Sequence, residues 1–198
     1  QSDNALLKGE FLNNHTLANT FGGTALSNPM KSWANIEPMI FRAKKDGKNY
    51  QVSGTLPWIS HIAPNQYCGA VAGVEGTNEQ VFFLLKFDQE RASKWQLHQC
   101  PTFLGMEGSS TWRIENYPVD VSEVIASPCK EFIERIRGAF VLMQMGIGAG
   151  IILGAIDDIK QSAAVSNAFL EDQAGNLMLE FDVLVNKVLG LAKTPFAT

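Results

Sequence analysis

The sequence has few cysteines and histidines, and their spacing excludes the usual metal sites and disulfide frameworks. The three cysteines are Cys68, Cys100 and Cys129; they lie far apart, are odd in number and form no CxxC pair. The three histidines show no metal-ligand spacing either. We therefore expect no metal centre, and we expect reduced thiols in a cytoplasmic protein.

Positive charge is also scarce. Charged residues make up 18% of the chain, and the formal net charge is −4. Proteins that bind nucleic acid usually carry a broad basic surface, so we expect no nucleic-acid partner. Four basic residues do cluster around one turn, where a solvated hairpin tip is the simpler interpretation; they are Arg42, Lys44, Lys45 and Lys48.

Several signatures of targeting and catalysis are missing. The N-terminal residues QSDNALLKGEF contain no basic segment followed by an apolar run, so we expect no signal peptide. The chain has no Gly-x-Ser-x-Gly nucleophile elbow, no glycine-rich phosphate loop and no dinucleotide-binding fingerprint. Nothing in these patterns favours a serine hydrolase or a P-loop enzyme.

One long stretch lacks charge altogether. Residues 138–156 are just long enough to span a bilayer, and Gly146, Gly150 and Gly154 have the spacing that lets helices approach closely. The alternative is a buried helix of a bundle. We favour the buried helix and expect no membrane partner, because Gln144 is central and no aromatic belts flank the stretch.

The patterns that are present predict an α+β fold. With 198 residues and 45% hydrophobic content, the chain can bury a core as one domain, or as one domain plus part of another. We expect a short helical lead-in (1–20), a β-domain (21–128) and a partial helical domain (129–198). This is an antiparallel β-barrel or sandwich followed by a helical hairpin of a partial helix bundle. The expected strands are Met39–Lys44, Asn49–Ser53, Tyr67–Val74, Gln80–Phe87, Gln96–Gln99 and Thr111–Val119, and the expected long helices cover 130–161 and 165–193.

The segment DGKNYQVSGTLPWIS, residues 46–60, is the most informative part of the chain. Its Asp-Gly pair favours a two-residue type I′ hairpin turn. In the strand that follows, Tyr50 and Val52 share one face, and Gly54 permits a bend or a close approach. Trp58 and Ser60 point to the same side of an extended chain, which suits a flat heteroaromatic ligand with polar edges.

This segment resembles the G-x-K-x-W-I-[ST] stretch in the middle β-domain of the acyl-CoA dehydrogenase family. Ala25-Leu26-Ser27-Asn28-Pro29 is similar to the family's A-L-T-E-P stretch. Leu104 to Thr111, continued to Pro118-Val119, is similar to the run that closes that domain. Residues 132–158 then resemble the first long helix of the family's C-terminal helical domain, so the resemblance covers roughly residues 21–160.

The resemblance implies an FAD site built on five residues. In the family, the isoalloxazine ring lies against the β-domain. By position, Ser60 would hydrogen-bond near flavin N5, and Trp58 would pack on the ring. Ser27 would approach the pyrimidine edge, where Leu26 would offer backbone contacts, and Ser32 is the hydroxyl that could contact a phosphate.

The implied function is an FAD-dependent oxidoreductase that carries out the α,β-dehydrogenation of acyl-CoA or a related acyl thioester in fatty acid metabolism. The resemblance also implies a homo-oligomer. The catalytic base is unknown, because no motif supports either Glu171 or Glu180. Asn28 replaces the acid of T-E-P, so a carboxylate of the family's motif is missing. The family's N-terminal helical domain is also nearly absent, so we expect a fragment or a reduced relative. A non-catalytic flavin- or acyl-binding protein, a flavin monooxygenase of the same fold and a membrane-tethered protein remain alternatives.

Overall fold

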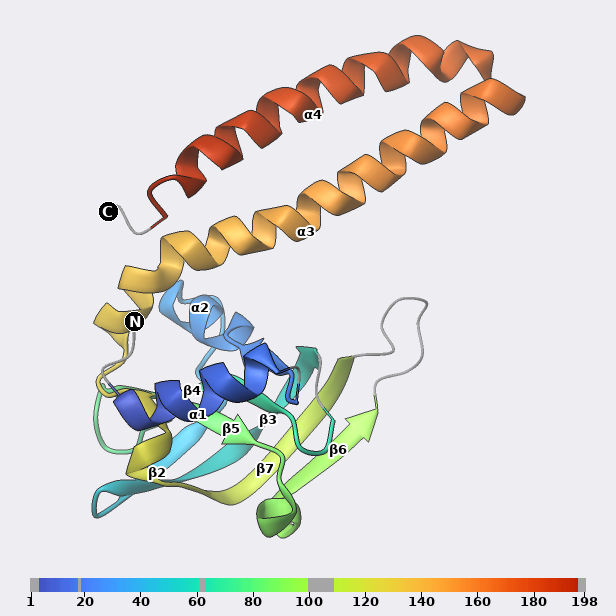
Figure 1. The fold of residues 1–198 in the computed structure, drawn as a ribbon. Coiled ribbons are helices and arrows are strands. Elements are labelled where there is room, and N and C mark those ends of the chain that lie inside the picture. Colours follow the sequence, from blue (N-terminus) through green and yellow to red (C-terminus); the bar gives the residue numbers. More distant parts are fainter. Residues whose placement is uncertain (1–3, 18, 61–62, 100–108, 196–198) are drawn as a thin grey trace. The chain divides into compact units, whose positions relative to one another are not determined.

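Eight strands and four α-helices make up the described part of the chain, which in this computed structural model comprises residues 4–17, 19–60, 63–99 and 109–195 (Figure 1). The α+β class is confirmed. The chain separates into two units, Gln1–Phe132 and Ile133–Thr198. The α-helices are α1 (Ala5–Thr16), α2 (Ser27–Trp33), α3 (Lys130–Val165) and α4 (Glu171–Ala192), and the 3₁₀ helices are η1 (Gln89–Lys94), η2 (Val121–Glu123) and η3 (Ala168–Leu170). The strands are β1 (Gly22–Ala25), β2 (Arg42–Asp46), β3 (Asn49–Ser60), β4 (Tyr67–Val74), β5 (Gln80–Lys86), β6 (Trp95–Gln99), β7 (Ser109–Val119) and β8 (Val124–Ala126).

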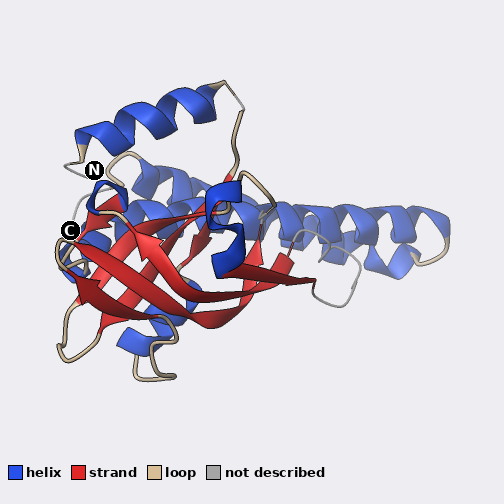
Figure 2. Cartoon of the chain, turned by 90° about the horizontal axis from the view of Figure 1, so that it is seen from below, coloured by secondary structure: helices blue, strands red, loops and turns tan. Residues whose placement is uncertain are grey.

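The strands form one mixed, strongly curved sheet (Figure 2). Its order is β6-β7-β3-β2-β4-β5-β8, and β1 pairs with β4 outside this path. Most pairs are antiparallel, as the sequence predicts, but β4 runs parallel to both β1 and β2. Parallel neighbours need a long connection between them. Between β1 and β4, α2 and the β2–β3 hairpin supply it, and between β2 and β4 the connection runs through β3. Short-range turn signals do not reveal these pairings.

The predicted hairpin is present, but its turn differs from the prediction. Strands β2 and β3 pair antiparallel, with Asp46 opposite Asn49. The two loop residues are therefore Gly47 and Lys48, and only Gly47 has a positive φ, of 61°. A type II′ turn needs positive φ at its first central position alone, whereas type I′ needs it at both. The glycine is thus the first loop residue and not the second.

Strand β3 is longer than predicted and bends twice. It continues past Ser53 to Ser60, with irregular pairing against β7 between Val52 and Gly54 and again between Leu56 and Ile59. At Gly54, φ is +152°, and a Cβ atom would lie 2.6 Å from a ring carbon of Phe41. The close approach expected at this glycine is confirmed. The second irregularity, between Leu56 and Ile59, changes the direction of the last residues of the strand.

The core of the first unit lies inside the curved sheet and is largely aromatic. Phe41, Phe83, Phe87, Trp112 and Tyr117 are all fully buried. The ring centroids of Phe87 and Trp112 lie 3.7 Å apart. Burial of such large side chains contributes about 1.5–3 kcal/mol each, so this cluster dominates the stability of the sheet.

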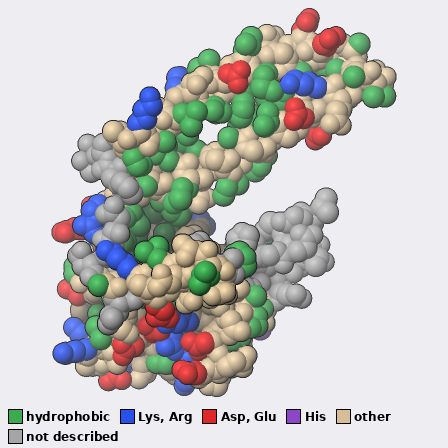
Figure 3. All heavy atoms as spheres, in the orientation of Figure 1, with side chains coloured by type: hydrophobic (Ala, Val, Ile, Leu, Met, Phe, Trp, Pro, Cys, Tyr) green, Lys and Arg blue, Asp and Glu red, His purple; other side chains and the backbone are tan. Residues whose placement is uncertain are grey.

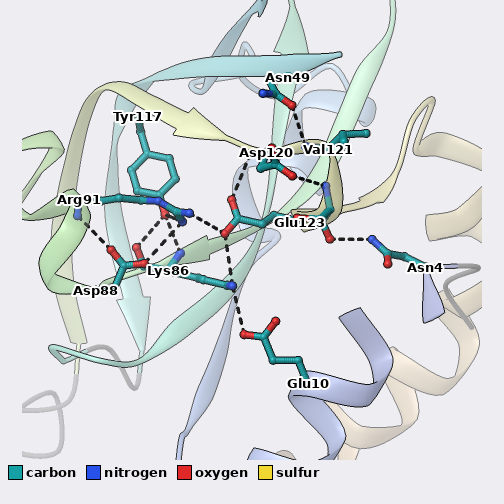
Figure 4. A network of polar contacts seen from close by, with 11 residues as sticks. Asn4, Glu10, Asn49, Lys86, Asp88, Arg91, Tyr117, Asp120, Val121 and Glu123 are labelled. Carbon is teal, nitrogen blue, oxygen red and sulfur yellow. Dashed lines mark hydrogen bonds and ion pairs between the residues drawn. The ribbon is translucent and has the colours of Figure 1, made fainter. Parts of the chain in front are cut away.

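A charged network ties three helical segments to the rim of the sheet (Figure 4). The Glu123 carboxylate is buried and accepts a 2.7 Å hydrogen bond from Arg91, while Lys86 lies 3.3 Å away. The Tyr117 hydroxyl accepts a hydrogen bond from Arg91 and donates one to the Lys86 carbonyl. Burial raises the pKa of Tyr117 to about 12, so it stays a neutral donor. Helix α1 joins through Glu10, whose carboxylate is 3.3 Å from Lys86.

The second unit contains α3 and α4, which run in opposite directions and are joined through η3 (Figure 1). The sequence predicts that the uncharged stretch of α3 is buried, but only 6% of its most apolar part is buried. That part has a mean hydropathy of 2.0, so by length and composition alone α3 is able to cross a membrane. Two helices cannot cover each other on all sides, which accounts for the exposure.

Candidate functional site

Two of the motifs singled out in the sequence meet at one cavity in the first unit. The cavity has a volume of about 90 Å³ and lies between α2, the segment after it and the bent end of β3. Its lining consists of Ala25, Ser27, Asn28, Lys31, Glu37, Ile40, Leu56, Pro57 and Trp58. Trp58 of the W-I-S segment therefore lines the same cavity as Ala25, Ser27 and Asn28 of the A-L-T-E-P-like segment.

Both the NH₂ group and the oxygen of the Asn28 side chain form hydrogen bonds in the wall of the cavity. Its side-chain NH₂ donates to a carboxylate oxygen of Glu37 at 2.9 Å and to the Pro38 carbonyl at 3.0 Å. Its side-chain oxygen accepts from the Ile40 backbone N–H at 2.9 Å. Asn28 is buried, so each of these bonds replaces water that the folded chain excludes. Asn28 replaces the acid of the family's motif, and in the structure its side-chain amide fixes residues 37–40 by hydrogen bonds.

Replacing Asn28 by aspartate is expected to destabilise the protein in a pH-dependent way. The introduced carboxylate would face Glu37 at hydrogen-bond distance, so its pKa would be raised in the folded state. A protonated carboxyl has one O–H donor where Asn28 has two N–H donors, so the variant should come closest to the wild type below about pH 4, the ordinary range of an unfolded aspartate. It should lose about 2 kcal/mol more of unfolding free energy at pH 7. Urea unfolding of both proteins across this pH range measures the difference.

A second substitution provides the control. With Glu37→Gln added, a side-chain amide can donate to the introduced carboxylate, so most of the loss at pH 7 should be recovered. A loss of stability that is independent of pH, or that Glu37→Gln does not relieve, would show that the contact between residue 28 and Glu37 does not stabilise this segment.

Trp58 presents its indole ring to solvent beside the cavity. It is 52% exposed, whereas Leu56 and Ile59 on the same strand are buried. The irregular pairing between Leu56 and Ile59 sets this pattern, and the Thr111 hydroxyl donates a 2.6 Å hydrogen bond to the Pro57 carbonyl there. An exposed tryptophan on a braced strand offers a rigid flat surface for a ring.

The first strand brings α2 close to the end of β3. A Cβ atom on Gly23 would lie 2.6 Å from the Ser60 carbonyl oxygen, so β1 and β3 pass in direct contact. Cys68 is buried beside this crossing, and burial raises the pKa of its thiol. The Cys68 thiol therefore stays protonated and is not a thiolate nucleophile.

The five predicted site residues do not all lie in the cavity. Ser27 and Trp58 line it together. Leu26 is buried at the start of α2, and Ser60 is exposed at the end of β3; neither contributes to the lining. Ser32 is half-buried on α2 and is also outside the lining. The roles assigned to all five remain predictions. The segment Leu104–Gly108 of the third motif lies outside the described residues.

Sequence reasoning missed two charged residues of the lining. Lys31 lies one helical turn after Ser27, and its ammonium is 3.5 Å from a Glu37 oxygen. The helical spacing of Ser27 and Lys31 was a usable signal for the lysine. Glu37 gave no such signal, because it reaches the cavity through a turn at Asn35, where φ is 57°. In the described ranges, no group of His, Cys, Asp or Glu side chains is arranged to hold a metal ion.

Solved structures share this fold at low sequence identity. Glutaryl-coenzyme A dehydrogenase in complex with glutaryl-CoA matches with a TM-score of 0.77 and 15% identity, over 96% of this chain and 51% of that one. A probable acyl-CoA dehydrogenase from Mycobacterium abscessus matches with a TM-score of 0.74 and 11% identity, over 97% of this chain and 54% of that one. Dibenzothiophene monooxygenase from Paenibacillus sp. A11-2 matches with a TM-score of 0.74 and 15% identity, over 97% of this chain and 52% of that one, and has also been solved with FMN and indole.

These likenesses establish an acyl-CoA dehydrogenase-like fold for nearly the whole chain. The chain spans about half the length of each of these solved proteins. No protein-family model matches the sequence, and no curated protein matches it.

Proposed function

We propose that this chain forms the flavin-facing part of an FAD-dependent oxidoreductase that dehydrogenates the Cα–Cβ bond of an acyl thioester. The observation that carries the proposal is the meeting of Ser27 and Trp58 at one cavity, from segments about thirty residues apart in the chain. The fold shared with acyl-CoA dehydrogenases supports the same function. Acyl-CoA is the proposed substrate class, and fatty acid metabolism the proposed setting.

The described residues fit one edge of a flavin ring. Trp58 offers a flat exposed face, and a hydroxyl (Ser27) and an ammonium (Lys31) line the same cavity. The cavity, at about 90 Å³, is smaller than the ~300–1,000 Å³ of most ligand pockets. It therefore suits the polar edge of a ring whose face lies on Trp58, and not a whole cofactor. When bound, FAD would accept the hydride that leaves the β-carbon of the acyl chain.

The chain's own residues would hold the ring edge and the charge near it. The Ser27 hydroxyl would hydrogen-bond a ring carbonyl, and Lys31 would stabilise negative charge at that edge. Glu37 is the carboxylate of the lining in the described part of the chain, but Asn28 and Lys31 engage its two oxygens. We therefore assign it to positioning, and the base that removes the α-proton is not assigned.

A flavin monooxygenase is the second candidate. The monooxygenase from Paenibacillus matches this chain as well as the Mycobacterium abscessus dehydrogenase does. A chain without an assigned base also fits a reaction that needs no α-proton removal. Anaerobic turnover of an acyl-CoA with a dye acceptor separates the two, because a monooxygenase requires oxygen. A third candidate, a non-catalytic flavin- or acyl-binding protein, would retain FAD and show neither activity.

Replacing Trp58 by alanine is expected to weaken FAD binding about tenfold, since stacking on an aromatic side chain contributes about 1–3 kcal/mol per ring. The Trp58→Phe variant should retain most of the affinity because it keeps a flat ring. The measurement is the visible absorption spectrum of the purified chain before and after titration with FAD.

Ile36→Ala is the matched control. Ile36 is also exposed and apolar, lies in the same unit and does not line the cavity, so FAD binding should not change. Equal FAD affinity in Trp58→Ala and the wild type would refute the site. A chain that binds no FAD in any form would refute the function.

We also propose a cytoplasmic location. Cys68 and Cys129 are free and buried, as expected for a protein in a reducing compartment.

A further inference from the structure

One edge of the curved sheet is open for pairing. Strand β6 stands at the end of the sheet order and pairs with β7 in antiparallel register (Figure 1). Among the described residues, no hydrogen bond joins the backbone of Gln96, Leu97 or His98 to any residue outside β7. In a strand that is paired on one side, alternate residues direct their N–H and C=O groups away from the neighbour. These groups of β6 are therefore free to pair with a further strand.

The other end of the sheet order is blocked. Strand β8 has only three residues. Just before α1, the Asn4 side chain donates hydrogen bonds to the Ser122 carbonyl at 2.7 Å and to the Val124 carbonyl at 3.2 Å. A short strand and a covering segment are two of the ways in which proteins prevent pairing at a sheet edge. In its described part, the chain thus protects one end of the sheet and leaves the other open.

Strand β6 carries none of the usual protective features. Its sequence, WQLHQ, has no charged residue and no proline, and its register against β7 contains no bulge. Charges, prolines and bulges are the features by which natural edge strands oppose the addition of a neighbour. At the end of the sheet where Figure 1 labels β6, hydrophobic and uncharged side chains reach the surface (Figure 3). With five residues, this edge has the length of a typical strand.

The side chains of β6 define what an added strand must carry. Leu97 lies opposite the fully buried Trp112, so it is on the core side of the sheet, yet it is 37% exposed. Trp95 shares that side, with its ring centroid 5.2 Å from that of Trp112. Gln96 and His98 lie on the other side and are exposed. A strand that alternates apolar and polar residues would cover Leu97 and keep its own polar residues in water.

We propose that the free edge of β6 is a docking site for an extended segment of a partner protein, which joins the sheet as an added antiparallel strand with apolar residues beside Trp95 and Leu97. Antiparallel pairing is the more stable arrangement per residue. Main-chain hydrogen bonds supply the affinity, and the half-exposed apolar side chains supply the selectivity. No residue of β6 lines the candidate flavin cavity, so this docking does not depend on flavin binding.

The test uses a synthetic peptide with the sequence of residues 109–115, SSTWRIE, labelled with fluorescein at its N-terminus. This sequence suits β6 because in the fold it already pairs with that strand in antiparallel register, and it places apolar and polar residues on alternate sides. Fluorescence anisotropy of the peptide, with the full chain titrated into it, should show saturable binding of one peptide to each chain.

A charge on the edge should oppose this binding. Leu97→Lys is expected to weaken it at least about tenfold, because an inward-pointing charge on an edge strand disfavours a neighbouring strand. Val121→Lys is the matched control. Val121 is also exposed and apolar, but it lies just before β8, at the blocked end of the sheet, so binding should not change. Circular dichroism checks that both variants keep the fold.

Methylation of the peptide backbone tests the mode of binding without changing the protein. N-methyl groups on alternate residues remove the donors from one side of an extended peptide at a time. For a strand added at the edge, one set of N-methyl groups should weaken binding at least about tenfold, and the other set should leave it unchanged. Loss of binding with both sets would mean that the peptide replaces β7 between β6 and β3, and would overturn the proposal.

Three further outcomes would overturn it. Absence of saturable binding at every chain concentration tested would show that the edge is not open. Equal binding to the wild type and to Leu97→Lys would place the peptide elsewhere on the protein. Self-association of the wild-type chain in sedimentation velocity, if Leu97→Lys abolishes it, would identify a second copy of the chain as the occupant in place of a partner protein.

Discussion

Replacing Gly54 by alanine is expected to lower the free energy of unfolding by about 3–5 kcal/mol. The added methyl would lie 2.6 Å from a ring carbon of Phe41 and 2.9 Å from the Ile40 carbonyl oxygen. Phe41 is fully buried and cannot move aside. Alanine also disfavours the φ of +152° found at this bend.

Urea unfolding followed by tryptophan fluorescence measures this loss for the first unit alone, because all four tryptophans precede residue 133. Gly47→Ala is the matched control. Its φ is also positive, at 61°, but no atom lies within 4 Å of the new methyl group, so the cost should be about 1–2 kcal/mol. If the two variants unfold at the same urea concentration, steric contact at Gly54 is not what limits the bend.

Replacing Glu123 by glutamine is expected to cost about 3 kcal/mol, because it removes the charge that Arg91 and Lys86 share in a buried place. The Glu123 side chain is 5% exposed, and Arg91 is 18% exposed. Burial lowers the pKa of Arg91, but its hydrogen bonds to Tyr117 and Glu123 outweigh that effect and raise it. An arginine guanidinium stays charged without a partner, so in the variant Arg91 loses its shortest ion pair and keeps only the 3.7 Å contact with Asp88.

Glu10→Gln tests the same lysine from the other side. Glu10 also lies 3.3 Å from Lys86, but its side chain is 54% exposed. Its removal should cost less than about 1 kcal/mol, and added salt should reduce that cost further. The Glu123 effect should persist in salt. Comparable losses in the two variants would mean that burial does not govern this network.

Much of the first unit could be predicted from sequence because its strands carry local signals. The alternation of Tyr50 and Val52 marked β3, and β4 begins and ends where the pattern predicts, at Tyr67 and Val74. The parallel pairing of β1 with β4 could not be predicted, since it depends on which distant strand has a free edge. The short β1 strand carries too few residues for a periodic signal.

The candidate site could be predicted only at residues whose type or sequence motif is itself a signal. Trp58 is conspicuous on a strand, and Ser27 follows from its motif. The place of Glu37 could not be predicted, because it lies at the cavity only through the positive φ of Asn35 and the hydrogen bond from Asn28. Residues that position others through a loop leave no period in the sequence.

For the helical hairpin, the secondary structure was easier to predict from the sequence than the burial of its side chains. Its two helices were predictable from composition and spacing, but their exposure was not. Burial depends on the number of neighbouring helices, and the sequence pattern of α3 would be the same beside one partner or three.

The sheet pairings also determine when during synthesis the cavity can form. The β2–β3 and β4–β5 hairpins join neighbouring segments and can close as soon as they leave the ribosome. The cavity is different, because β1 must wait for β4, with Gly22 opposite Tyr67, and the bent end of β3 must wait for β7, with Leu56 opposite Trp112. A nascent chain can therefore pair these two hairpins well before the cavity forms, and a ligand of the cavity would stabilise only the last stage of folding.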